Sequence, residues 1–291
     1  MRHFSLLFLL PPLLHFAAAT SAAEMVALKT ETINEGPVSV RVRYAPAESE
    51  DAYDTPPRVT VLYRGRRVAS LVLEEVVRKP SVFITQMDPS NTTPEVVIAG
   101  YTGGAHCCTV FRVVTAPPGR EERRWKVVSL GGFDGGPEKP EDMDGDGLSE
   151  LRLQDDRFLY RYDCYACSYA PPLILSVRDG REVNLTRRRA FRPLLRAEAE
   201  RVRRDILTMQ KENPKESPNG LLAGYVAVEA LLGNGPAAWR FMLRHHKPQP
   251  QDYCPMPKPD GIECPVRPLE ISFPLELSIF LRETGYVGRR D

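Results

Sequence analysis

The chain has 291 residues, a formal net charge of +1 and 42% hydrophobic residues, which is the composition of an ordinary globular protein. This length suggests one large domain or two small ones, with a core large enough to fold without help from metals or disulfides. The near-neutral charge excludes the strong electrostatic field expected of a protein that binds nucleic acid or an anionic membrane.

Residues 1–23 predict a signal peptide. A short basic start (Met1–His3) precedes an apolar run (Phe4–Ala19), and small residues precede Glu24. The run is short for a membrane span and contains two prolines, so cleavage is favoured over a membrane anchor. There is no cysteine near the cleavage site to carry a lipid. We therefore expect a periplasmic or secreted protein with no transmembrane segment after signal cleavage.

From about Val26 to Val183 the sequence predicts strands. Val38–Tyr44 alternates apolar and polar residues, the period of a half-buried strand. Arg58–Tyr63 and Arg67–Leu73 flank a short turn, which indicates a hairpin. Further strands, separated by Gly, Pro, Asn and Asp, are expected at Val82–Thr85, Glu95–Ala99, Thr109–Val114, Trp125–Leu130, Leu148–Leu153, Arg157–Tyr162 and Leu173–Val177.

Near Asn184 the period changes to that of helices. Four helices are expected, at Phe191–Met209, Leu221–Leu232, Pro236–His245 and Ser272–Gly285. Strands followed by helices predict an α+β fold. We expect a β-rich domain at 24–185, with propeller-blade-like antiparallel sheets, and a helical C-terminal region at 186–291 with a cysteine-bearing loop.

The clearest chemical motif is the acidic loop Asp142–Glu150. Its carboxylates stand at loop positions one, three, five and nine, namely Asp142, Asp144, Asp146 and Glu150. Alternating carboxylates in a tight loop favour Ca²⁺, a hard cation that takes several oxygen ligands, whereas Mg²⁺ demands octahedral geometry. Position seven, Leu148, is expected to donate its backbone carbonyl. The alternative is an acidic turn held by hydrogen bonds from its own backbone, without a metal.

An EF-hand is not predicted, because Leu153 stands where that motif closes with glutamate and the exit from the loop alternates like a strand. The run Asp-x-Asp-Gly-Asp-Gly-Leu-x-Glu-Leu instead resembles the calcium loops of FG-GAP and VCBS repeats of integrin-like β-propellers. This resemblance implies that Asp142, Asp144, Asp146, the Leu148 carbonyl and Glu150 ligate Ca²⁺, with Glu150 replacing the commoner Asp. The chain also resembles exported bacterial proteins that share the segment Tyr101–Cys108, which implies no known activity.

A weak internal repeat supports the blade interpretation. Asp88–Val96 is a degenerate copy of the acidic loop, and its Glu95 precedes Glu150 by 55 residues, about the length of one blade. The copy has lost most acidic side chains and is expected to bind no metal. Two or three such units do not obviously close a ring, so a partial propeller or a curved stack of sheets is an equal alternative to a propeller.

The six cysteines favour disulfides in an exported chain. The Cys107–Cys108 and Cys164–Cys167 pairs occupy similar places in the two repeats, so we expect disulfides between the pairs, with the partners left open. Cys254 and Cys264 most simply pair with each other. Two alternatives are disfavoured: a redox C-x-x-C, because the flanks of Cys164–Cys167 argue against a helix, and zinc bound by His106 and cysteines, because adjacent cysteines suit one tetrahedral ion poorly.

No catalytic motif is recognisable. His106 follows Gly103 and Gly104, which could let the backbone approach a ligand or simply form a bend. The leading hypothesis is a non-enzymatic, calcium-stabilised module that binds an unidentified protein or glycan. The alternative is an exported hydrolase that uses His106, or Asp155 and Asp156, near the metal.

Overall fold

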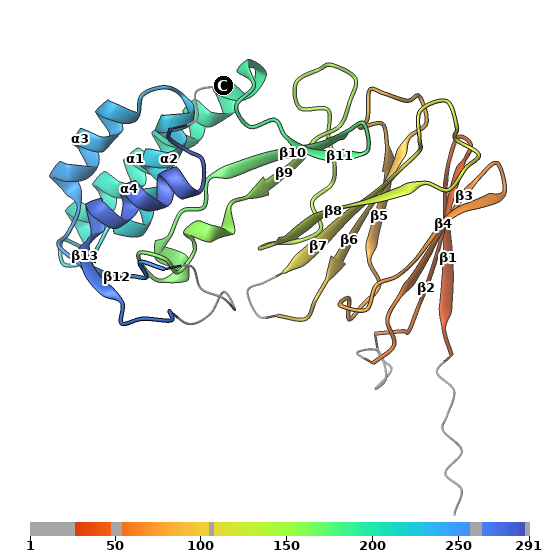
Figure 1. Ribbon diagram of the computed structural model, residues 1–291, viewed down its shortest axis with the longest axis horizontal. Helices are drawn as coiled ribbons and strands as arrows, with labels where there is room; N and C mark the ends of the chain where they lie inside the picture. The colour runs from red at the N-terminus through yellow and green to blue at the C-terminus, as the bar shows by residue number, and fades with distance from the viewer. Residues whose placement is uncertain (1–26, 48–53, 105–107, 257–263, 289–291) are drawn as a thin grey trace, which may run out of the picture.

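The computed structural model describes residues 27–47, 54–104, 108–256 and 264–288. Three antiparallel sheets follow one another from the N-terminal side, and a helical part lies beyond the third (Figure 1). The predicted signal peptide, Cys107 and His106 lie outside the described residues.

The first two sheets have four strands each, paired in chain order. The first contains β1 (Lys29–Glu35), β2 (Val38–Tyr44), β3 (Arg58–Tyr63) and β4 (Arg66–Val72). The second contains β5 (Ser81–Thr85), β6 (Glu95–Tyr101), β7 (Thr109–Thr115) and β8 (Lys126–Phe133). The third has three strands in the order β11 (Arg181–Asn184), β10 (Pro172–Arg178) and β9 (Leu151–Gln154).

The second sheet is buried on both faces. In β6, Val96 and Ile98 pack into the core shared with the first sheet, whereas Val97 and Ala99 pack into the core shared with the third. Successive side chains of a strand point to opposite faces, so a strand between two cores must be apolar at consecutive positions. The uninterrupted burial of this strand therefore places the second sheet in the middle of a stack.

The helical part consists of α1 (Arg192–Glu212), α2 (Asn219–Leu231), α3 (Gly235–His245) and α4 (Phe273–Glu283), with a small hairpin of β12 (Pro250–Tyr253) and β13 (Leu269–Ser272). Its core also takes in Phe158, Tyr162 and Tyr169, which belong to the connection between β9 and β10. The third sheet and the helices are thus joined by aromatic side chains from one loop.

The predicted α+β class is confirmed, with blade-like antiparallel sheets in the N-terminal part and helices in the C-terminal part. Within the described residues the sheets close into neither a barrel nor a propeller. No helix in this part of the chain has the length and apolarity needed to span a membrane.

Two expectations about local structure were wrong. Arg157–Tyr162 is not a strand; it begins in a 3₁₀ turn (Asp156–Phe158) capped by the Asp155 side chain. Its apolar alternation arises because Phe158 and Tyr162 both pack into the helical core. The β12–β13 hairpin was missed, because its strands carry mostly polar and half-exposed residues and give no clear period.

Two glycines of α2 allow the helix to lie directly on the β9–β10 connection. A Cβ atom at Gly224 would lie 2.3 Å from the carbonyl oxygen of Tyr169, and one at Gly220 would lie 2.5 Å from the carbonyl oxygen of Cys167. Real Cβ atoms do not approach backbone oxygens this closely, so any side chain here would force the two segments apart.

We predict that Gly224→Ala lowers the free energy of unfolding by about 1–3 kcal/mol, the usual cost of overpacking a tight contact. Gly235→Ala is the matched control, since its nearest neighbours would be 3.8 Å away, in ordinary contact. Denaturant titration of both variants checks this. Equal stability of the two variants would mean that α2 does not press on the loop.

Candidate metal centre and adjoining cleft

The acidic loop brings its three aspartates together. Carboxylate oxygens of Asp142, Asp144 and Asp146 lie within 4.8 Å of one another. Gly145 and Gly147 adopt positive φ values of 78° and 85°, which only glycine adopts without strain. The two glycines therefore produce the curvature that turns alternate carboxylates toward one centre.

Backbone amides of the loop also donate hydrogen bonds to these negatively charged carboxylates. Asp142 accepts hydrogen bonds from the amides of Gly145 at 2.8 Å, Asp146 at 3.1 Å and Gly147 at 3.0 Å. The Leu148 amide donates to Asp146 Oδ1 at 2.9 Å. These are the bonds expected of a metal-free acidic turn, and they also occur where a loop is pre-shaped for a cation, so they do not distinguish the two interpretations.

Glu150 closes the loop. It is 1% exposed, and its Oε2 accepts a hydrogen bond from the Met143 amide at 3.1 Å, whereas Oε1 is buried without a partner among the described residues. Burial, followed by the charges of the three aspartates, raises the pKa of Glu150 to about 7. A buried carboxylate oxygen without a partner costs free energy that a cation would offset.

The internal copy of the loop provides a direct comparison. Glu95, the counterpart of Glu150, is 0% exposed, and both of its oxygens are satisfied. The amides of Met87 and Asp88 donate to Oε2, and the side chains of Asn91 and Thr115 donate to Oε1. In this copy hydrogen-bond donors fill the role that a cation would fill beside Glu150.

Both loops join neighbouring sheets. Asp88 accepts hydrogen bonds from the amides of Asp179 and Gly180, in the turn between β10 and β11. In the other direction, the Ser149 amide donates to the carbonyl of Gln86 at 2.7 Å, just after β5. The acidic loop and its copy therefore connect the second sheet to the third from both sides.

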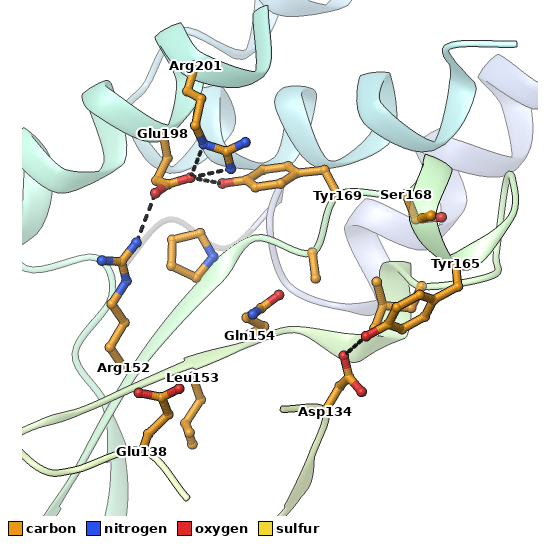
Figure 2. A pocket seen from close by; sticks show the side chains of 14 residues that line it. Asp134, Glu138, Arg152, Leu153, Gln154, Tyr165, Ser168, Tyr169, Glu198 and Arg201 are labelled. Carbon is orange, nitrogen blue, oxygen red and sulfur yellow. Dashed lines mark hydrogen bonds and ion pairs between the residues drawn. The ribbon is translucent and has the colours of Figure 1, made fainter. Parts of the chain in front are cut away.

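A cleft of about 550 Å³ lies between the third sheet, the loop after β8 and α1. Polar and aromatic side chains from these elements line it, including Asp134, Glu138, Arg152, Gln154, Tyr165, Tyr169, Glu198 and Arg201. Figure 2 shows two hydrogen-bonded groups on opposite sides, with Gln154 between them.

On one side of the cleft, Glu198 is the common acceptor. Arg201 Nη2 lies 2.7 Å and the Tyr169 hydroxyl 3.1 Å from its Oε2, and Arg152 Nη2 lies 2.8 Å from its Oε1. Burial alone would raise the pKa of Glu198, but the hydrogen bonds and charges of these neighbours hold it below its ordinary value. The charged side chains on this side of the cleft are therefore held in place by hydrogen bonds to one another.

On the other side the Tyr165 hydroxyl donates to Asp134 Oδ2, and the Asp134 amide donates to Asp156 Oδ2. Burial raises the pKa of Asp156 to about 6, and the charges of Asp134 and Asp155 act in the same direction. Its Oδ1 is buried and has no partner within the described part of the chain. The pKa of this carboxyl beside the cleft is therefore well above its ordinary value.

Asp155 and Asp156, which the sequence suggested as a catalytic pair, have separate surroundings. Asp155 is 2% exposed, binds the Arg157 guanidinium through both carboxylate oxygens, and accepts a hydrogen bond from the Tyr286 hydroxyl at 2.9 Å. It is therefore held in a structural network that anchors the end of the helical part to the third sheet.

The cleft residues were not predicted, since they come from segments up to 67 positions apart, Asp134 to Arg201. One local signal was available: Asp134 follows a predicted strand and stands between pairs of glycines, at the type of turn where polar side chains serve function.

The disulfides correct one prediction. Cys164 and Cys167 are joined to each other, with Cα atoms 5.0 Å apart, and not to the Cys107–Cys108 pair. An extended segment would point the two cysteines apart, but a 3₁₀ turn (Tyr165–Cys167) brings them together. Cys254 and Cys264 are also joined to each other, and Cys108 is disulfide-bonded.

The glycines near His106 form a bend. Gly103 has a φ of 91° and backs onto the Val77 side chain, and the Tyr101 hydroxyl donates to the carbonyl of Gly104. The amide and hydroxyl of Thr102 both donate to the Cys108 carbonyl. Because His106 lies outside the described residues, its expected role as a ligand contact stays a prediction.

Fold and site together define an α+β protein of stacked antiparallel sheets with an acidic loop at a sheet junction and a polar cleft against the helical part. A family model described as the sll0997 C-terminal domain matches residues 195–285. The chain is 33% identical over 261 residues to the "Probable thylakoid lumen protein sll0997" of Synechocystis sp., covering 88% of this chain and 75% of that protein. The chain belongs to the sll0997 family.

A second relative is the "Uncharacterized protein y4bJ" of Sinorhizobium fredii, which is 30% identical over 242 residues, covering 77% of this chain and 36% of that protein. The chain thus corresponds to about a third of this longer relative. No solved structure matches the chain.

Asp156 gives a pH-dependent prediction. Its pKa in the folded protein, about 6, lies above the ordinary value of 3.8, so its charge destabilises the fold above pH 6 and this penalty disappears as pH falls toward 4. Asp156→Asn should raise the melting temperature at pH 7 by roughly 2–5 °C and leave it nearly unchanged at pH 4.

Asp205→Asn, at an exposed position of α1, is the control and should show no such pH-dependent gain. Thermal melts of wild type and both variants at the two pH values check this. A loss of stability for Asp156→Asn at pH 7 would contradict the assigned protonation behaviour.

Proposed function

We propose that this protein is an exported, non-enzymatic binding module stabilised by Ca²⁺. Asp142, Asp144, Asp146 and Glu150 would hold the ion with their carboxylates, and Leu148 with its backbone carbonyl. The observation that carries this proposal is the buried Oε1 of Glu150, which has no partner among the described residues, together with the three converging aspartates of the same loop.

The contrast with Glu95 supports a cation over a simple acidic turn. Two equivalent buried glutamates follow two related loops, and only the one without three aspartates has a complete set of hydrogen-bond donors. All-oxygen donors in a tight loop suit Ca²⁺ better than a softer metal. The likeness of the loop to FG-GAP and VCBS repeats supports the same ion.

Export is supported by three independent features. Residues 1–23 have the pattern of a signal peptide. The described cysteines are disulfide-bonded, which is typical of an oxidising compartment. The Synechocystis relative is named as a probable thylakoid lumen protein, and the lumen lies outside the cytoplasm. We therefore assign this chain to the periplasm or to secretion.

The cleft beside α1 is the candidate ligand site. Its walls combine the planar carboxylate, amide and guanidinium groups of Asp134, Gln154 and Arg152 with the tyrosine rings of Tyr165 and Tyr169. A ligand rich in hydroxyls, such as a glycan, would meet hydrogen-bonding groups and aromatic surface together, and a polar peptide segment would meet the same groups.

If the acidic loop binds Ca²⁺, the melting temperature of the protein should depend on the Ca²⁺ concentration. At Ca²⁺ about 100-fold above its dissociation constant, the melting temperature should rise by roughly 5–10 °C relative to chelator. Asp144→Ala should abolish this rise, because it removes a ligand without touching the core. Differential scanning calorimetry in calcium and in chelator measures both.

Ser90→Ala is the control, because it removes a polar side chain from the internal copy, which is expected to bind no metal. This variant should keep the full calcium response. A wild-type protein whose melting temperature is the same in calcium and in chelator would rule out the metal site.

A second candidate function is an exported hydrolase, favoured by one observation: Asp156 has a pKa raised to about 6 and contacts Asp134 at the wall of the cleft. Such a carboxyl is suited to general acid catalysis. Incubation with chromogenic ester and glycoside substrates tests this candidate. Turnover that disappears in Asp156→Asn would favour the hydrolase, and absence of turnover would favour the binding module.

A further inference from the structure

The Cys164–Cys167 disulfide contributes little to the stability of the fold. It encloses only Tyr165 and Ala166, whereas Cys254 and Cys264 are ten positions apart. In the chain-entropy model a cross-link stabilises the fold by closing a loop in the unfolded chain, and the effect shrinks with the loop. A bond across two intervening residues therefore has little structural purpose of this kind.

Its surroundings suit thiol–disulfide exchange. Cys164 is exposed and Cys167 is half-buried, so an incoming thiolate reaches Cys164 first. The Cys167 amide lies 3.2 Å from Cys164 Sγ and donates to it. A directed amide favours negative charge on sulfur, which stabilises a thiolate at this position. The sequence alone gave no sign of this donor, because the turn that aims it was not predicted.

Asp163 supplies a proton acceptor at the same place. One of its carboxylate oxygens and both sulfur atoms lie within 4.8 Å of one another. Its Oδ1 accepts a hydrogen bond from the Cys164 amide at 2.8 Å, while Oδ2 is buried without a partner among the described residues. The Asp163 carboxylate, one oxygen of which lies this close to both sulfurs, is placed to take up and return the proton of a thiol.

We propose that Cys164, Cys167 and Asp163 form a thiol–disulfide exchange centre that reacts reversibly with the dithiol of a partner protein. A partner thiolate attacks Cys164 Sγ, the bond to Cys167 breaks, and the Cys167 thiolate takes up a proton. The second partner thiol then loses its proton and attacks the mixed disulfide, which releases Cys164. Two electrons and two protons pass from the partner, which becomes a disulfide, to this pair, which becomes two thiols.

In the reverse direction Asp163 removes the proton from Cys167, whose thiolate then attacks the mixed disulfide at Cys164.

The neighbouring surface suits a protein partner. Tyr160 is 60% exposed, and its ring lies 5.4 Å from that of Tyr165, inside the disulfide loop. The exposed ring of Tyr160, backed by the half-buried ring of Tyr165, offers apolar contact area to a docking chain.

The loop is supported from behind, so reduction need not unfold it. The carbonyl of Cys167 is pressed against Gly220 of α2. The Ser168 hydroxyl donates to the Cys164 carbonyl at 2.9 Å. These contacts do not involve the sulfur atoms, and they remain when the bond is open.

The first test is a redox titration of the folded full-length chain. Protein is equilibrated with graded ratios of reduced to oxidised dithiothreitol, quenched with acid, alkylated and mapped by mass spectrometry. We expect Cys164 and Cys167 to be reduced at a ratio roughly tenfold lower than Cys254 and Cys264. Reduction of both pairs together, or reduction only in denaturant, would overturn the proposal.

The second test separates Asp163 from a structural role. Asp163→Asn keeps the acceptor for the Cys164 amide but cannot take up a proton. We expect reoxidation of the reduced pair to slow by roughly tenfold or more, with a changed dependence of the rate on pH. Cys254→Ser/Cys264→Ser should leave this rate unchanged, and circular dichroism verifies the fold of each variant. A wild-type rate and pH profile in Asp163→Asn would remove Asp163 from the centre.

Discussion

Two buried glutamates organise the junction between the second and third sheets. A carboxylate removed from water must be matched by donors or a cation, or take up a proton, because its desolvation is otherwise too costly to sustain. Glu95 meets this requirement with backbone and side-chain donors alone. Glu150 meets it only in part, because its Oε1 has no partner among the described residues. The negative charges of the three aspartates make its ionised form still less favourable. The same physical constraint therefore has two solutions in one chain.

The stacking of the sheets determines where these loops lie. Because β6 is buried on both faces, its neighbours must cover it from either side, and the connections between sheets run along their edges. The third sheet in turn presents one face to the second sheet and sends the β9–β10 connection into the helical core. The cleft forms where this connection, the loop after β8 and α1 meet. The position of the cleft therefore follows from the same stacking of sheets and helices that forms the cores.

Sequence patterns were sufficient where burial follows a single period. The alternation in Val38–Tyr44 matches β2. The helix predicted at Phe191–Met209 begins and ends within one helical turn of the ends of α1. They failed at Arg157–Tyr162, where Phe158 and Tyr162 alternate like a strand because both pack into the helical core. The aspartates of the loop were readable because they are local, whereas the cleft depends on side chains, such as Asp134 and Glu198, that only the tertiary fold brings together.

The acidic loop also extends beyond the two sheets that it joins. Met143, its second residue, packs with Ile174, Leu185 and Phe191, on the opposite face of the third sheet and just before α1 begins. The Arg188 guanidinium lies 3.9 Å from Asp146 Oδ2, in the same entry to the helical part. An ion held in this loop would therefore also stabilise the contact between the third sheet and the segment that leads into α1.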